Sequence, residues 1–509
     1  MSALVPAATL GEWRRIRRYA VPPAMIEAAA RAREAGDWRA ACAAADVRVE
    51  ASPEQLRAFA DDLAHLAPDL VRWHAPRSVG RGDTTLAPRY LLALVRRGGA
   101  ALVVHMPRLG NAAQHLTMRV TDDLDGNGKI QAVDWGNMRY LWDARRAGEL
   151  PAHVCGPRAL ELLELQDDGR AVDAWAAVGV DVPPPDPGAH GDWRARQLMT
   201  DFTALDVDPA CLLAAARARG GPTASFDVSG YGELRLHDLQ TDRPIAEWVQ
   251  PVGWNGSRPV DRVSVAEYRR PVDLHLLRFG CLSPDQLHPL VGPHLAAYWN
   301  GSSPAAAEDP WSGPVRVRCN GTWHEVGWAD GRLRMPHSDE ERRREHTLLA
   351  LGGELQGCFA AEHGWQDRAT RLPRLLEAQR RELLVRAQHG DLDAVLARLD
   401  AGADPRVRDP HRRTLLHLLP ALERRVPGDP ALALIGRLLA GGLDIDARDR
   451  RERTPLYSAV HGDGSPELVR ALLEAGARTD VEDSVGISLA EVYRQHRLED
   501  LAFLEALLT

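Results

Sequence analysis

Three stretches in the last quarter of the chain share one pattern, and this pattern decides how the C-terminal part is expected to fold. They read HGDLDAVLARLDAGADPRVRD (389–409), PALALIGRLLAGGLDIDARD (430–449) and GSPELVRALLEAGARTDVED (464–483). Each has apolar residues at the spacing of one helix face, ends its helical run with Leu-x-x-Gly and then closes a turn on aspartate. Because glycine permits the left-handed conformation that ends a helix, each stretch predicts an amphipathic helix followed by an extended turn.

A second, shorter helix is predicted between these stretches. RRTLLHLL (412–419) and ERTPLYSAV (452–460) place a threonine ahead of an apolar run, where its hydroxyl can cap the helix. The closing aspartates lie 40 and then 34 residues apart, so the first interval predicts an insertion, placed at Glu423–Asp429. Such repeats indicate helical units that bury their apolar faces against each other. The leucines expected to be buried between repeats are Leu396, Leu399, Leu438, Leu439, Leu472 and Leu473.

Residues 377–509 resemble the ankyrin repeat family, in which one repeat is about 33 residues long. The matching residues are Thr414, Leu415, Leu416 and His417 with Thr454, Pro455, Leu456 and Tyr457 at the family's Thr-Pro-Leu-His position, and Gly402, Ala403 and Asp404 with Gly476 and Ala477 at its Gly-Ala-Asp position. The pair Gly441-Gly442 departs from that pattern, and Ser488–Leu508 is expected to be a C-terminal cap. The predicted fold class is therefore multidomain, with an α+β N-terminal region followed by an all-α ankyrin-repeat solenoid.

Ankyrin arrays share no chemistry, so the resemblance implies a non-catalytic scaffold that binds another protein. The predicted turns are rich in arginine, whose guanidinium group suits the carboxylates and phosphates of a partner with an acidic surface. The alternative is that these arginines are solvated charges, partly offset by acidic neighbours in the same turns. The candidate partner-binding residues are Arg406, Arg408, Arg412, Arg413, Arg448, Arg450, Arg451 and Arg453.

One short motif in the N-terminal region follows the calcium-loop pattern D-x-[DN]-x-[DN]-G. Its candidate metal ligands are Asp123, Asp125, Asn127, the carbonyl of Lys129 and Asp134. Position twelve is aspartate where the pattern usually has glutamate, which shortens its reach. We expect the loop to join strands 116–120 and 130–133 as a hairpin, with Ca²⁺ as the candidate cofactor. The alternative is a turn rich in Gly, Asn and Asp that needs no metal.

Composition narrows the possible classes of protein and partner further. The chain has 509 residues, with 63 basic and 71 acidic side chains and a net charge of −8, which argues against nucleic acid or a membrane as partner. The six cysteines form no CxxC pair, so reduced thiols rather than a zinc knuckle are predicted, and no histidine spacing indicates a metal. The N-terminus lacks the order of a secretory signal, and no apolar run reaches the ~18 residues of a spanning helix. These features predict a cytoplasmic protein, and the high Gly, Pro and Arg content is typical of a GC-rich bacterial genome.

Proline-rich segments suggest the domain boundaries. We expect an α+β domain at 1–182, a linker at 183–191, a second α+β region at 192–370 and the repeats at 377–509. The second region is predicted to contain a meander of strands at 315–319, 323–328 and 332–335, with turns at Asn-Gly and Asp-Gly. No nucleotide-binding, zinc-protease or serine-hydrolase motif is present. The sequence thus favours an adaptor, and the alternative is an enzyme or toxin-like effector whose active site lies in 1–370.

Overall fold

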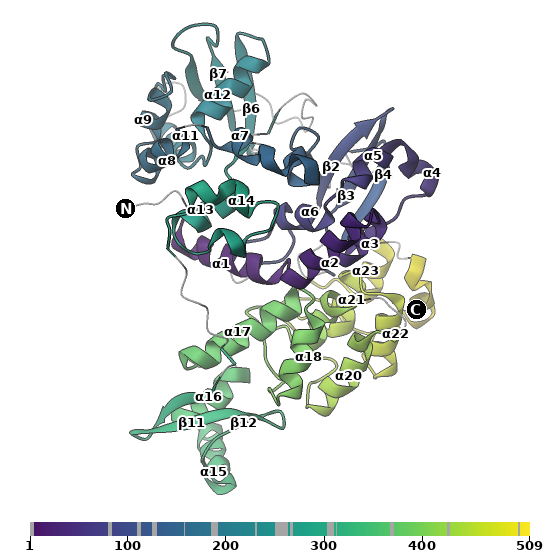
Figure 1. Cartoon of the computed structure of the whole chain (residues 1–509). Helices are drawn as coiled ribbons and strands as arrows, with labels where there is room; N and C mark the ends of the chain where they lie inside the picture. The colour runs from purple at the N-terminus through teal and green to yellow at the C-terminus, as the bar shows by residue number, and fades with distance from the viewer. Residues whose placement is uncertain are drawn as a thin grey trace.

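The computed structural model describes residues 5–79, 84–108, 113–124, 130–156, 158–184, 192–229, 232–249, 263–264, 268–302, 310–311, 313–366, 371–424, 428–496 and 499–508. The buried apolar side chains of these residues gather into three large clusters. In Figure 1 the N-terminal elements lie above the C-terminal helices, and β11, β12, α15 and α16 lie at the bottom, below α17.

The first core joins the N-terminal helices to one face of a five-stranded sheet with the order β1-β4-β3-β2-β5. The helices are α1 (Ala7–Tyr19), α2 (Pro23–Glu34), α3 (Trp38–Ala44), α4 (Pro53–Leu56), α5 (Ala60–Ala64), α6 (Pro68–His74), α7 (Leu150–Val154) and α8 (Ala159–Asp167). The strands are β1 (Val47–Val49), β2 (Tyr90–Arg97), β3 (Ala100–His105), β4 (Leu116–Thr121) and β5 (Gln131–Asp134). Two later helices, α13 (Val272–Arg278) and α14 (Gly292–Leu295), return to this core. The first core therefore includes residues from the region expected to be a second domain.

The prediction that the calcium-loop motif joins strands 116–120 and 130–133 as a hairpin is wrong. Strand β5 pairs in parallel with β2, whereas β4 pairs with β3 and with β1. The connection from β4 to β5 therefore crosses the sheet instead of turning back beside β4. Leu124 and Ile130, at its two described ends, pack against the small apolar cluster on the other face of the sheet. Local alternation in the sequence does not reveal that β5 pairs with β2, a strand that is not its neighbour along the chain.

A second, smaller core lies between helices and a four-stranded sheet of order β8-β7-β6-β9. Its helices are α9 (Ala171–Ala176), α11 (Asp192–Thr203) and α12 (Pro209–Ala218). Its strands are β6 (Thr223–Ser229), β7 (Gly232–His237), β8 (Ile245–Val249) and β9 (Val263–Ser264). The N-terminal half of the molecule is thus α+β. Most of the expected linker at 183–191 lies outside the described residues.

The third core runs from Val315 to Leu504 and combines strands with helices. Its sheet has the order β10-β11-β12, with β10 (Val315–Cys319), β11 (Thr322–Ala329) and β12 (Arg332–Arg334). Two helices follow the sheet, α15 (Asp339–Ala350) and α16 (Gly357–Gln366). The expected all-α solenoid is therefore wrong, because the meander at 315–334 and the helices beyond residue 372 share one buried core. The C-terminal half is a mixed unit of strands and helices.

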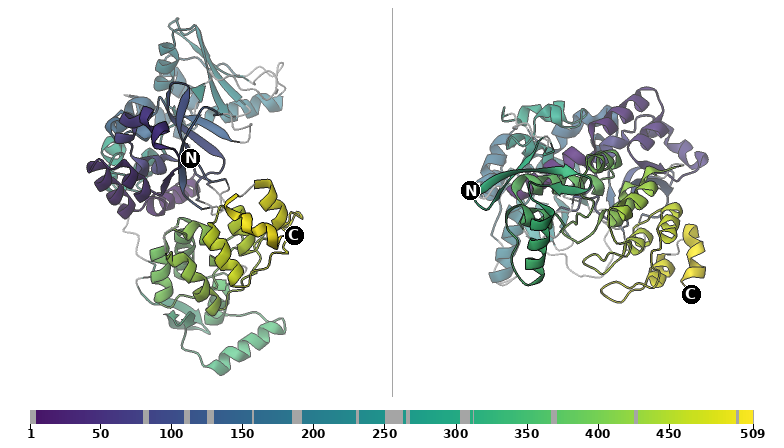
Figure 2. Two further views of the ribbon diagram at one scale, coloured as in Figure 1. Left: turned by 90° about the vertical axis from the view of Figure 1, so that its right-hand side faces the viewer. Right: turned by 90° about the horizontal axis from the view of Figure 1, so that it is seen from below.

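Helices in this half follow one another as neighbouring pairs, which both views of Figure 2 show from green to yellow. They are α17 (Arg374–Gln388), α18 (Leu392–Asp400), the 3-10 helix η8 (Leu415–Leu418), α19 (Leu419–Leu422), α20 (Pro430–Ala440), α21 (Pro455–His461), α22 (Pro466–Glu474), α23 (Leu489–His496) and the 3-10 helix η9 (Glu499–Leu507). Of the leucines expected to be buried, Leu399, Leu438 and Leu472 are. Leu396, Leu439 and Leu473 are half-buried against the same core.

Among the described residues, no helix is both long and apolar enough to span a membrane.

Candidate metal centre

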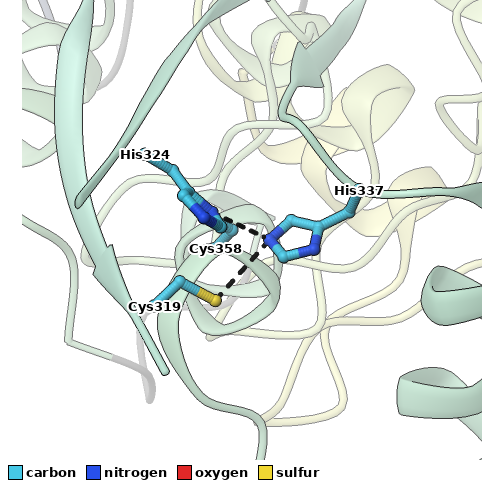
Figure 3. Close-up of side chains that lie close together, drawn as sticks. All are labelled: Cys319, His324, His337 and Cys358. Carbon is cyan, nitrogen blue, oxygen red and sulfur yellow. Dashed lines mark hydrogen bonds between the residues drawn. The ribbon is translucent and has the colours of Figure 1, made fainter. Parts of the chain in front are cut away.

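Two cysteines and two histidines meet at one end of the C-terminal sheet (Figure 3). Their possible ligand atoms, one each from Cys319, His324, His337 and Cys358, all lie within 4.8 Å of one another. Nε2 of His337 is 3.6 Å from Sγ of Cys319 and 3.1 Å from Nδ1 of His324. Nδ1 of His324 is in turn 3.5 Å from Sγ of Cys358. The four side chains thus converge on one point.

The spacing of these atoms matches a tetrahedral zinc ion. With Zn–S of about 2.3 Å and Zn–N of about 2.0–2.1 Å, tetrahedral geometry places sulfur and nitrogen ligands about 3.5 Å apart and two nitrogens about 3.3 Å apart. The two observed sulfur–nitrogen distances are 3.6 and 3.5 Å. The nitrogen–nitrogen distance of 3.1 Å is slightly shorter. A Cys₂His₂ donor set is also one that zinc prefers in structural sites.

The strand register brings the first two ligands to the same face. Along β10, Val315, Val317 and Cys319 are buried and alternate with exposed arginines. His324 pairs directly with Val317 on the neighbouring strand, so its side chain lies on the buried face with Cys319. A tight turn at Asn320-Gly321, both with positive φ, returns the chain within two residues. One hairpin therefore supplies half of the site.

The other two ligands come from the ends of helices. His337 follows β12 and directly precedes Ser338, whose hydroxyl accepts a hydrogen bond from Glu341 N and so caps α15. Cys358 is the second residue of α16 and is fully buried. The residue before it, Gly357, has φ +58°, and a Cβ there would lie 2.5 Å from Sγ and 2.8 Å from Cα of Cys319. Only glycine lets the start of α16 approach the hairpin this closely.

Neighbouring groups orient the histidine at the edge of the site. Nδ1 of His337 is 3.9 Å from the carboxylate of Glu341, and its side chain is only 7% exposed. Its ring also packs on Phe359, with ring centroids 4.7 Å apart. The Glu341 carboxylate thus lies on the Nδ1 side of the ring, although 3.9 Å is too long for a hydrogen bond. With Nδ1 facing Glu341, Nε2 is the nitrogen that faces the other three side chains.

The four side chains offer the donor atoms that a structural zinc ion prefers. Burial, together with the adjacent Cys319, raises the pKa of the Cys358 thiol to about 12. A zinc ion held by these residues would displace the thiol protons and neutralise the thiolates. Four protein ligands fill a tetrahedral shell and leave no open position for substrate.

The structure tests little of the calcium-loop motif. Asp125, Asn127 and Lys129 lie outside the described residues. Asp123 and Asp134 are exposed, and Asp134 accepts a 2.8 Å hydrogen bond from Gly136 N and lies 3.3 Å from Arg96. Calcium binding at this loop therefore stays a prediction.

The eight candidate partner-binding arginines divide by burial. They lie in two turns closed by backbone hydrogen bonds, from Asp409 N to Arg413 O and from Asp449 N to Arg453 O. Arg413 and Arg453 are buried, and they pair with Asp409 at 2.6 Å and with Asp483 at 3.1 Å. Arg406 and Arg408 are half-buried. The exposed members are Arg412, Arg448, Arg450 and Arg451.

The sequence contained only part of the signal for the metal site. Its ligands have the spacing Cys-x₄-His-x₁₂-His-x₂₀-Cys, which contains no CxxC and no short His-His pair. Cys319 and His324 flank an Asn-Gly turn, so their proximity was predictable from the expected meander. The prediction of no metal-ligand spacing overlooked this pair. The chain matches no protein-family model and no curated protein.

Proposed function

We propose that residues 315–508 form a zinc-stabilised module that binds another protein, and that the chain is a non-catalytic scaffold. The observation that carries this proposal is the convergence of four protein ligands within 4.8 Å of one another. A site with four protein ligands suits a structural ion, whose binding free energy contributes directly to folding. The zinc would therefore stabilise the surface on which a partner binds.

Contacts next to the site support this role. The sheet meets the first helix pair where Gly331 N donates a 3.0 Å hydrogen bond to Gly402 O. Trp328 Nε1 donates to Gln379 Oε1 of α17 at 2.9 Å. From α16, Trp365 Nε1 donates to Asp404 O at 3.1 Å. These bonds place the sheet and α16 against the first helix pair, within the same buried core. Zinc would hold the sheet and α16 together.

The resemblance of the helix pairs to ankyrin repeats supports a protein partner. Neighbouring turns of the array are joined by backbone bonds, from Arg450 N to His411 O and from Ser484 N to Arg451 O, both 2.7 Å. This holds the exposed arginines of the two turns on one side of the array. Their positive charge would attract an acidic protein surface and raise its association rate.

The zinc site is tested by metal analysis of the purified full-length chain. We expect one zinc per chain, and we expect Cys358→Ser to lose it and to unfold at a lower temperature. Cys281→Ser removes a half-buried free cysteine outside the site and should keep the metal. A chelator should destabilise the unchanged chain and the control alike. Absence of zinc from all three proteins, or a Cys319–Cys358 disulfide in the unchanged chain, would refute the proposal.

The binding surface is tested by charge reversal in the full-length chain. Arg412→Glu with Arg450→Glu should weaken capture of an acidic partner by roughly ten-fold, because exposed ion pairs contribute up to about 1 kcal/mol each. The matched control reverses two exposed arginines of α15, Arg343→Glu with Arg344→Glu. Capture from cell extract and its salt dependence are compared for both variants. Equal loss in both would mean that net charge, not the turns, determines binding.

A further inference from the structure

An arginine without a counter-ion is buried where the N-terminal unit meets the C-terminal helices. Arg77 is 9% exposed, and its NH2 group donates a 2.8 Å hydrogen bond to Arg72 O. Its Nε and NH1 atoms find no acceptor. No carboxylate among the described residues forms an ion pair with it. Guanidinium stays charged in proteins, so a buried unpaired arginine is costly and calls for a partner.

The nearest cations add to this excess of positive charge. Arg72 is 1% exposed and donates from Nε to Ala20 O at 3.2 Å, but its NH1 atom has no hydrogen-bond acceptor. The one carboxylate near it is Asp46, 3.6 Å away with a half-exposed side chain. Arg17 has a counter-ion of its own, because Nε lies 2.6 Å from Asp273. Burial, and then the charges of Arg72 and Arg17, lower the pKa of Arg77.

The C-terminal helices supply the other wall. His389, directly after α17, is buried, and its Nε2 lies 2.9 Å from the hydroxyl of Thr84. Its Nδ1 atom has no partner. Burial lowers the pKa of His389 well below its usual value, and the charges of Arg77 and Arg72 lower it further. The ring is thus neutral and can donate from Nδ1 when Nε2 accepts the threonine proton. Each unit therefore contributes buried polar atoms without a hydrogen-bond partner: NH1 of Arg72 with Nε and NH1 of Arg77 from the N-terminal unit, and Nδ1 of His389 from the C-terminal helices.

We propose that Arg72, Arg77 and His389 bind a small oxyanion of the phosphate type, held between the two units. The planar fork of arginine matches the oxygens of such an anion, and charge-assisted hydrogen bonds would satisfy the orphan donors. Two direct contacts accompany the site at the same junction. Ala113 N donates to Gly462 O at 3.0 Å, and His115 lies 3.4 Å from Asp463. The anion strengthens the docking of the N-terminal unit on the C-terminal helices.

The test compares thermal unfolding of the full-length chain in phosphate, sulfate and chloride at equal ionic strength. Phosphate and sulfate should raise the unfolding temperature of the unchanged chain by several degrees over chloride, since a ligand of the folded state stabilises it by mass action. Arg77→Met should be at least as stable as the unchanged chain in chloride, because it removes an unpaired buried charge. Its response to phosphate should be lost, and calorimetry should show at least ten-fold weaker phosphate binding.

Arg413→Met is the matched control. Arg413 is also buried, but its Nε lies 2.6 Å from Asp409. This variant should lose stability in every salt and keep the full response to phosphate. If Arg77→Met does not fold, calorimetric titration of the unchanged chain with inorganic phosphate still tests whether the chain binds the anion. No heat and no phosphate-dependent stabilisation of the unchanged chain would overturn the proposal and assign water to the orphan donors. A phosphate response of Arg77→Met equal to that of the unchanged chain would also overturn the proposal.

Discussion

At the scale of one residue, His417 shows how a buried side chain joins two consecutive turns of the C-terminal half. Its Nδ1 accepts a 3.1 Å hydrogen bond from Thr414 N, and its Nε2 lies 3.0 Å from Arg453 O in the next turn. The neutral ring thus connects two consecutive units. Burial lowers the pKa of His417 to about 4, although the Arg453 carbonyl opposes this.

This pKa predicts a loss of stability in acid. An unfolded histidine titrates near pH 6.5, so between pH 6.5 and 4 the unfolded chain binds more protons than the folded chain. Stability due to His417 is therefore present above about pH 6.5 and falls as pH drops toward 4, by up to roughly 3 kcal/mol. His417→Gln cannot titrate and should show a smaller fall in urea unfolding across this range. His411→Gln, at the turn itself, should keep the full fall. Parallel pH profiles for the two variants would contradict this assignment.

The metal ligands show where prediction from single residues stops. Val317 and Cys319 alternate along a strand, and the Asn-Gly turn fixes the register that places His324 beside them. This half of the site followed from local patterns. His337 comes from the segment between β12 and α15, and Cys358 joins only because α16 packs against β10, a tertiary contact between residues far apart in sequence. Sequence spacing could not reveal that contact.

Among the elements, α22 tests the register of the helix pairs most simply. Leu472 is fully buried in the third core, while Leu473, one position along the helix, is half-buried. Leu472→Ala should destabilise the chain by about 2–5 kcal/mol, because it removes buried contacts and leaves a cavity. Leu473→Ala should cost less than half as much. Denaturant unfolding of both variants measures the difference, and equal costs would mean that the helix is rotated from the described register.

The strands of the meander and several of the C-terminal helices were predicted within a few residues, because their signals are local. The turns at Asn320-Gly321 and Asp330-Gly331 marked the meander, and proline and threonine marked the starts of helices. Strand partners were harder to predict. The segment after β4 has alternating residues on both sides, which is typical of a hairpin, yet β5 pairs with β2. Alternation shows that a strand exists but not which neighbour it pairs with.

At the scale of the whole molecule, buried cores do not follow the order of the chain. Asp273 lies in the first core, where it pairs with Arg17 and accepts a 3.1 Å hydrogen bond from Trp73 Nε1. His288 likewise lies 3.0 Å from Asp69. The meander joins the C-terminal helices instead of the region that precedes it. Composition and proline-rich breaks mark where a chain can be divided, but only tertiary packing shows which segments share a buried core.

The central claim is that one zinc ion, held by Cys319, His324, His337 and Cys358, completes the core of the C-terminal half. X-ray absorption at the zinc edge of the purified full-length chain tests it most directly. We predict a first shell of two sulfur atoms at about 2.3 Å and two nitrogen atoms at about 2.0–2.1 Å. A first shell dominated by oxygen, a shell with one sulfur or none, or a purified chain that contains no zinc would contradict it.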